Sequence, residues 1–153
     1  MKNIVDMTPL VSVDLLVGFN GPCGERLYLL GKRTNSPAKG SMFVPGARVY
    51  KNEPITETIR RIAQTECGIA QYSAPIRRGL YEHWYPDSFH SDATPTHYFS
   101  LCYEITIDSA RDTMVDIQHE YFRHLSKSEI LDSPDVHKYT KYFFIPNATN
   151  RLQ

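Results

Sequence analysis

The chain has 153 residues, with 17 lysines and arginines against 17 aspartates and glutamates, so its formal net charge is zero. This length fits one domain with its own core, and the lack of an overall basic field argues against a general nucleic-acid-binding protein. No apolar run approaches the roughly twenty residues of a membrane span, and the three cysteines lack metal-type spacing. We therefore expect a soluble cytoplasmic protein, one domain over residues 1–153, that binds neither nucleic acid nor membrane.

The expected elements are three strands, one helix, three further strands and two helices. Residues 10–17 are almost entirely apolar, which is typical of a strand buried on both faces of a mixed sheet. Asp14 interrupts this run, and from the residues alone it is a strand-edge carboxylate bonded to the backbone or to an arginine. The glycines and proline within 21–24 mark a hairpin turn. Further strands are predicted at 26–30, 42–44, 76–85, 96–107 and 121–123, and helices at 54–67, 126–131 and 136–144.

The helix at 54–67 carries a carboxylate whose position is unusual. Pro54 suits the first turn and Gly68 suits the C-terminal stop. Glu66 falls in the middle of the apolar stripe, which consists of Ile55, Ile59 and Ile62. A carboxylate turned towards a core needs a cation beside it, unless the last turn frays and Glu66 reaches water. Glu57 and Arg61, spaced i, i+4, are interpreted as an ordinary stabilising ion pair.

The stretch from Gly46 to Ile69 resembles the Nudix box. The pattern of that box is a glycine, then a glutamate, then an arginine followed directly by a glutamate, then two adjacent glutamates. A second glycine follows one residue after that glutamate pair. Counting back from Gly68, the final glutamate, the early glutamate and the arginine are all present, as Glu66, Glu53 and Arg61. Three positions depart from the pattern, with Ala47 for the opening glycine and Ile62 and Thr65 for two glutamates.

These departures are similar to those of one Nudix branch, the GDP-mannose mannosyl hydrolases. Other segments agree with that branch, namely TPLVSVDLLV from Thr8, LLGKRTNSPAKG from Leu29, FVPG from Phe43, THY from Thr96 and QHEYFRHL from Gln118. The resemblance implies an α+β fold, the Nudix α/β/α sandwich, in which helices flank a mixed central sheet. It also implies a homodimer that acts on a small-molecule nucleotide sugar.

The resemblance assigns roles to residues that carry little meaning by themselves. His119 becomes the catalytic base, and the Mg²⁺ ligands become the backbone carbonyl of Gly46, Glu66 and Gln118. Arg33 and Arg48 become diphosphate clamps, Asp14 lies near the sugar, and His83 and Tyr98 contact sugar or phosphate. Without the resemblance, the two arginines are solvated cations, the two aromatic residues belong to hairpin or core packing, and the Gln118-His119 dipeptide has no interpretation.

Fewer box glutamates favour one Mg²⁺ per site and cleavage at the anomeric carbon, because cleavage at phosphorus calls for metals that polarise phosphorus and activate water. The expected reaction is hydrolysis of GDP-mannose or GDP-glucose to GDP and free hexose, with inversion. Two alternatives stay open, a Nudix pyrophosphatase that cleaves at phosphorus and an inactive nucleotide-sugar-binding protein. Members of the branch carry additional aromatic residues before the motif at Thr8, so we expect a guanine or dimer contact here that is weaker, differently built or lost.

Overall fold

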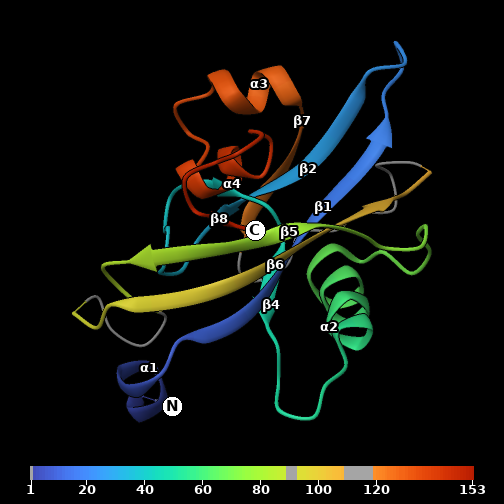
Figure 1. Ribbon diagram of the computed structural model, residues 1–153. Coiled ribbons are helices and arrows are strands. Elements are labelled where there is room, and N and C mark those ends of the chain that lie inside the picture. The colour runs from blue at the N-terminus through green and yellow to red at the C-terminus, as the bar shows by residue number, and fades with distance from the viewer. Residues whose placement is uncertain (1, 89–92, 109–118) are drawn as a thin grey trace.

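The computed structural model describes residues 2–88, 93–108 and 119–153, and its strands form one eight-stranded mixed sheet (Figure 1). The strands are β1 Leu10–Asn20, β2 Arg26–Arg33, β3 Met42–Phe43, β4 Gly46–Arg48, β5 Ile76–Tyr85, β6 Thr96–Thr106, β7 His119–Ser126 and β8 Arg151–Leu152. The helical segments are α1 Lys2–Met7, α2 Ile55–Arg61, the π-helical η1 Ile62–Glu66, α3 Lys127–Asp132 and α4 Lys138–Tyr142.

Six strands follow the order β3-β2-β1-β6-β5-β8, while β4 pairs with β1 and β7 pairs with β2. The β1–β6 ladder is parallel and the other ladders are antiparallel. β2 pairs with the C-terminal end of β1, at residues 18–20, and β4 pairs with β1 further back, at residues 12–14. β2 and β4 therefore share one side of β1, and Asp14 lies on the β4 segment.

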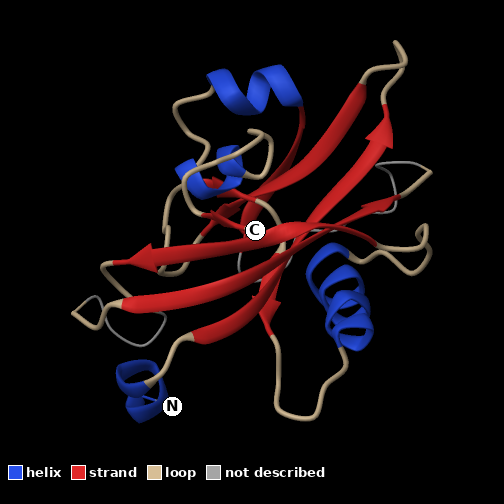
Figure 2. Ribbon diagram, viewed as in Figure 1, coloured by secondary structure: helices blue, strands red, loops and turns tan. Residues whose placement is uncertain are grey.

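Helices cover both faces of the sheet, with α2 on one face and α3 and α4 on the other (Figure 2). The alternation along β1 explains the two cores, because successive side chains of a strand point to opposite faces. Val13, Leu15 and Val17 pack with Ile59 of α2, whereas Leu16 belongs to the cluster that contains residues of α3 and α4. The predicted α/β/α arrangement, including a strand buried on both faces, is confirmed.

The predicted helix at 54–67 begins as expected but changes its winding. Pro54 is extended and caps α2, and Gly68 has a φ of 69°, the left-handed conformation that ends helices. Between them the last turn is π-helical, and the Ile69 amide donates to the Ala63 carbonyl at 2.8 Å. Periodicity at 100° per residue misses this turn. π-Helical turns are rare and are frequent at functional sites.

The predicted Glu57–Arg61 ion pair is wrong. Glu57 forms its ion pair with Arg60 instead, whose Nε donates to the Glu57 carboxylate at 2.9 Å. Arg61 turns towards the loop before α2, where its Nε donates to Glu53 at 2.8 Å and its terminal nitrogen donates to the Arg48 carbonyl at 2.8 Å. Two acceptors in the loop outweigh one exposed partner on the helix, so spacing alone gives the wrong pair.

The remaining elements agree closely with the sequence. The strand predicted at 76–85 is observed over those residues, and the strand at 96–107 ends one residue earlier. Ser126 caps α3 through a capping box with Glu129, and α4 is shorter than the predicted 136–144. α1 was not predicted. In the part of the chain that is described, no helix has the length and apolarity needed to cross a membrane.

Candidate active site

Gly46 lies between two carboxylates that come from distant parts of the sequence. Its amide donates to Glu66 Oε2 at 3.2 Å, and its Cα pairs with that of Asp14 across the β1–β4 ladder. A Cβ atom at this position would lie 2.3 Å from Asp14 Oδ1 and 2.9 Å from the Val13 carbonyl oxygen. Only glycine fits between these groups, so the short strand β4 holds its backbone against both carboxylates.

Glu66 is buried, with 5% of its surface exposed. The interpretation in which the last turn frays and Glu66 reaches water is therefore wrong. The carboxylate bonds to the Gly46 amide, and its charge contributes to raising the pKa of Arg61, after larger contributions that begin with the Glu53 hydrogen bond. The π-helical turn that contains Glu66 thus brings a charged oxygen to the backbone of β4.

Asp14 is also buried, but in the part of the chain that the structure describes the hydrogen-bond partner of its carboxylate is neither the backbone nor an arginine. The Ser100 hydroxyl, from β6, donates to Asp14 Oδ2. Burial raises the pKa of Asp14 to about 6, although the Ser100 hydrogen bond and the positive charge of Arg33 act in the opposite direction. A carboxyl group with this pKa changes its protonation state close to neutral pH, which is typical of functional sites.

Tyr98 lies within electrostatic reach of both Arg33 and Arg48. Burial raises the pKa of the Tyr98 phenol, the charges of Arg48 and Arg33 lower it, and the charge of Asp14 raises it. Arg33 ends β2, and its Nε is buried without a hydrogen-bond partner in the described part of the chain. A buried guanidinium donor normally has an acceptor, so Arg33 is ready to bind an anion.

His83 pairs with Tyr98 across the β5–β6 ladder, and 2% of its surface is exposed. Its ring stacks on Tyr139 at a centroid distance of 4.2 Å, and its Nδ1 is 3.9 Å from Asp14 Oδ2. Burial lowers the pKa of His83 to about 3, with a further contribution from His137. The imidazole is therefore neutral at neutral pH and forms no ion pair with Asp14. Its predicted contact with a substrate stays a prediction.

The two residues predicted to supply a metal ligand and the base are placed only in part. Gln118 lies outside the described residues, and for His119 only the main chain is described. That main chain opens β7, where His119 pairs with Arg33 of β2. The backbone of the predicted base thus lies beside one of the predicted phosphate clamps. The roles of both residues stay predictions.

The oxygen donors fit a magnesium ion held by few protein ligands. Mg²⁺ prefers oxygen, keeps several waters and commonly uses one or two carboxylates. Glu66 and the Gly46 backbone are adjacent, with a second carboxylate on the far side of Gly46. Among residues 2–88, 93–108 and 119–153, no group of three or more His, Cys, Asp and Glu side chains is gathered for a metal.

Sequence reasoning missed three residues near the site. Ser100 and Tyr85 interact with Asp14, and His137 contacts the Tyr85 ring. Burial and then the charge of Asp14 raise the pKa of Tyr85 well above its usual value. Burial lowers the pKa of His137 to about 4, followed by the charges of Lys138 and Arg33. The alternation of the 96–107 strand placed Ser100 on the same face as Tyr98, which was the one available signal.

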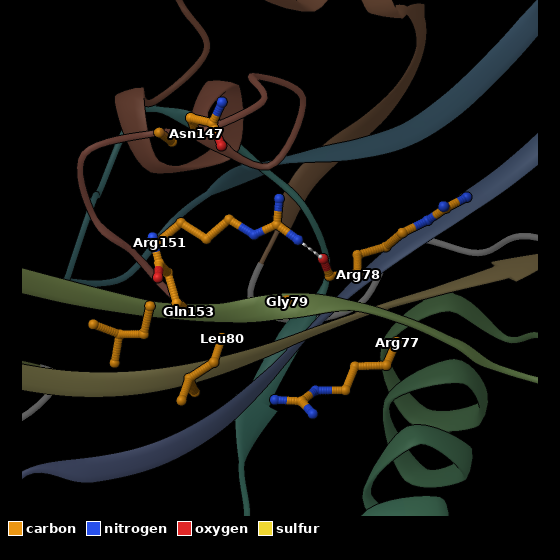
Figure 3. A pocket seen from close by; sticks show the side chains of 9 residues that line it. Arg77, Arg78, Gly79, Leu80, Asn147, Arg151 and Gln153 are labelled. Atoms are coloured by element: carbon orange, nitrogen blue, oxygen red, sulfur yellow. Dashed lines mark hydrogen bonds between the residues drawn. The ribbon is translucent and has the colours of Figure 1, made fainter.

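A cavity of about 550 Å³ lies at the β5–β8 edge, and none of these residues lines it. Figure 3 shows Arg77 and Arg151 on opposite sides of β5, with Arg78 directed away from both. The Arg78 guanidinium is paired with Glu104, with its Nε donating at 2.7 Å, and Arg151 donates to the Arg78 carbonyl at 2.9 Å. The three guanidinium groups do not converge on one point, so this cavity lacks the arrangement that binds a phosphate.

Comparison with known proteins identifies chains that are similar in sequence or in fold. No family model matches the chain. The low-salt glycan biosynthesis protein Agl8 of Haloferax volcanii is 38% identical over 120 residues, which cover 78% of this chain and 72% of that protein. A MutT NUDIX hydrolase from Burkholderia pseudomallei is similar in structure, with a TM-score of 0.70 and 21% identity over 90% of this chain and 96% of that one. The MutT protein from Methanosarcina mazei Go1 gives a TM-score of 0.68 and 21% identity over 90% and 92% of the two chains.

Proposed function

The chain belongs to the Nudix hydrolase family, and we propose that it hydrolyses GDP-mannose or GDP-glucose to GDP and free hexose. Water attacks the anomeric carbon, and the configuration at that carbon is inverted. The segments that resemble the GDP-mannose branch support this choice, at 8–17, 29–40, 43–46, 96–98 and 118–125. The role in glycan biosynthesis that names the Haloferax relative also supports a substrate that contains a sugar.

One observation carries the proposal, the loss of carboxylates from the Nudix helix. Ile62 occupies a glutamate position of the box, and its side chain is fully buried in the core against β1. Thr65 occupies another, and its hydroxyl donates to the Arg61 carbonyl at 2.6 Å. Glu66 is the box glutamate left at this turn. Cleavage at phosphorus relies on several metal ions, whereas cleavage at carbon needs a base for water and stabilisation of the departing diphosphate.

Magnesium is the expected cofactor, with one ion per site. Glu66, the Gly46 carbonyl and Gln118 would hold it, and when bound it would offset the charge of the departing diphosphate. Arg33 and Arg48 bind the same diphosphate, because a planar guanidinium matches phosphate oxygens. The buried Nε of Arg33, which has no hydrogen-bond partner among the residues that the structure describes, supports this role.

His119 accepts the proton of the attacking water. Imidazole with a pKa near its usual value of about 6.5 is suited to this step at neutral pH. The backbone pairing of His119 with Arg33 supports a position beside the diphosphate. Asp14 lies on the sugar side of the site, and its charge contributes to raising the pKa of Tyr98. His83 and Tyr98 contact the sugar or phosphate on the same side.

The position of bond cleavage tests the proposal. Hydrolysis of GDP-mannose in ¹⁸O-labelled water should place the label in the hexose and leave GDP unlabelled, as read by mass spectrometry of both products. Label in GMP or in a sugar phosphate would instead establish the pyrophosphatase reaction. Binding of GDP-mannose by calorimetry without turnover at saturating Mg²⁺ would establish an inactive binding protein.

The variant His119→Gln identifies the base within the same experiment. Removing a positioned general base should lower kcat by about 10²–10⁴-fold, while the label stays in the hexose because the diphosphate still departs. A variant as fast as the parent would remove His119 from the mechanism without affecting the cleavage position.

A homodimer in the cytoplasm is also part of the proposal. Exposed apolar side chains on α1 and at the start of β1 support a partner surface, and they belong to Ile4, Met7 and Val11. Light scattering coupled to size-exclusion chromatography measures the oligomeric state directly. A monomer at micromolar concentration would contradict the dimer.

A further inference from the structure

Ser100 is a fully buried hydroxyl residue in the middle of β6, with no exposed surface. Its Oγ donates a hydrogen bond to Asp14 Oδ2 on the neighbouring strand β1. The parallel register pairs Ser100 with Ser12. Asp14 lies two residues after Ser12 on the same strand, so the side chains of Ser100 and Asp14 lie on one face of the sheet. This contact joins two residues that are 86 positions apart in the sequence.

No other group holds Asp14 in the same way. In the described part of the chain, Ser100 is the one hydrogen-bond donor to this carboxylate. His83 Nδ1, at 3.9 Å, is too distant for a hydrogen bond. Arg33 acts on Asp14 through its charge. The terminal torsion of an aspartate is broad, so a carboxylate without a fixed partner samples a range of orientations.

The orientation of Asp14 matters because of what lies against its other oxygen. Oδ1 is the atom that a Cβ at position 46 would meet at 2.3 Å, so this oxygen lies directly over the Gly46 backbone. Ser100 anchors Oδ2, and Oδ1 is thereby directed towards the segment whose amide binds Glu66. Rotation of the carboxylate would move Oδ1 away from Gly46.

We propose that Ser100 is a positioning residue that fixes the Asp14 carboxylate over Gly46 during hydrolysis of the nucleotide sugar. The inference rests on the proposed function. Ser100 itself does not touch the substrate, because it has no exposed surface. The effect of Ser100 on catalysis therefore depends on Asp14, whereas a general role in folding would not. Substitutions at the two positions can separate these roles.

A double-mutant cycle tests this coupling, using Ser100→Ala, Asp14→Asn and the double variant. Loss of the Ser100 hydroxyl should lower kcat about 10- to 100-fold, the effect of a misplaced catalytic group, and should change KM less than kcat. In the Asp14→Asn background the same substitution should change kcat by less than about twofold, because residues that act as one unit are not additive. Unfolding midpoints of all variants are measured in parallel.

Ser12→Ala is the matched control, since Ser12 is a buried serine on the same face and directly opposite Ser100. It should keep the parent kcat. Equal losses from Ser12→Ala and Ser100→Ala, or an equal loss from Ser100→Ala with and without Asp14, would overturn the inference while leaving the proposed function intact. A parent protein without nucleotide-sugar hydrolysis would overturn both.

Discussion

Glu53, in the loop between β4 and α2, and Asp14, on β1 opposite Gly46, are two carboxylates that the protein holds in opposite ways. Glu53 accepts hydrogen bonds from the Tyr50 amide at 2.9 Å, the Thr58 hydroxyl at 2.9 Å and two nitrogens of Arg61 at 2.8 and 2.9 Å. Arg61 is the largest cause that lowers the pKa of Glu53 to about 2. Each oxygen of Glu53 has a partner.

Within the described residues, the Asp14 carboxylate accepts one hydrogen bond, from Ser100, and the positive charge of Arg33 also acts on it. Burial outweighs both and raises the pKa of Asp14 to about 6. Glu53, whose two oxygens are both hydrogen-bonded, stabilises the loop and has little capacity left to bind a ligand. One that is buried with few partners costs stability, and that cost is typical of a group retained for binding or chemistry.

Gly46→Ala should have the largest effect, because it disturbs Asp14 without changing its chemistry. The added Cβ would meet Asp14 Oδ1 and the Val13 carbonyl, so the backbone of β4 must shift. We expect kcat/KM for GDP-mannose to fall at least about 10²-fold, and the free energy of unfolding to fall by about 1–3 kcal/mol. Steady-state kinetics and urea unfolding measure the two effects.

Gly24→Ala is the control for that substitution. Gly24 has a φ of 80° in the β1–β2 turn, so alanine is strained there, but no atom lies within 4 Å of its added Cβ. It should lose stability of a similar order and keep its activity. Equal activity losses in both variants would mean that Gly46 matters only through folding.

The sequence predicted the helix and strands well wherever one local signal was sufficient. Pro54 and Gly68 gave the ends of the box helix, and alternation gave the strands at 76–85 and 96–107. The π-helical turn at 62–66 was missed because periodicity assumes constant winding. The partner of Arg61 was missed because Glu53 lies in the preceding loop, and contacts between a helix and a loop have no fixed spacing.

The residues of the candidate site also fall into those that the sequence identified and those that it missed. Periodicity had already marked Glu66 as unusual. The roles of Gly46, Glu66 and Asp14 came from the family resemblance, and the structure brings these three together. Ser100 carries no motif, and its contact with Asp14 depends on the register of two strands that are far apart in sequence. Parallel pairing of this kind is set by packing across the whole sheet, which explains why no local pattern identified it.

The pH dependence of stability should separate Asp14 from Glu53 by sign. The pKa of Asp14 is raised from 3.8 to about 6, so the folded state loses stability as the pH rises through this interval, and the full cost is present above about pH 6. The pKa of Glu53 is lowered from 4.5 to about 2, so its contribution is complete above pH 4.5 and is lost as the pH falls towards 2.

Asp14→Asn should therefore be more stable than the parent at pH 8, by at most about 3 kcal/mol, and similar to it at pH 4. Glu53→Gln should be less stable than the parent at pH 8, with the difference narrowing below pH 4. Urea unfolding at pH 4, 6 and 8, with a chelator present to remove metal, measures both series. A parent that gains stability relative to Asp14→Asn as the pH rises would contradict the sign assigned to Asp14.

The smallest effect should come from Thr140→Val, which removes a buried polar atom outside the site. Thr140 is fully buried on α4, and its hydroxyl has no hydrogen-bond partner in the described part of the chain. Valine keeps the branched shape and removes the cost of burying the unpaired hydroxyl, so stability should stay the same or rise by up to about 1 kcal/mol. Thr58→Val is the matched control, because Thr58 is equally buried but its hydroxyl donates to Glu53 at 2.9 Å. It should lose about 1 kcal/mol, and equal losses in the two variants, measured by urea unfolding, would mean that hydrogen bonding does not distinguish the two threonines.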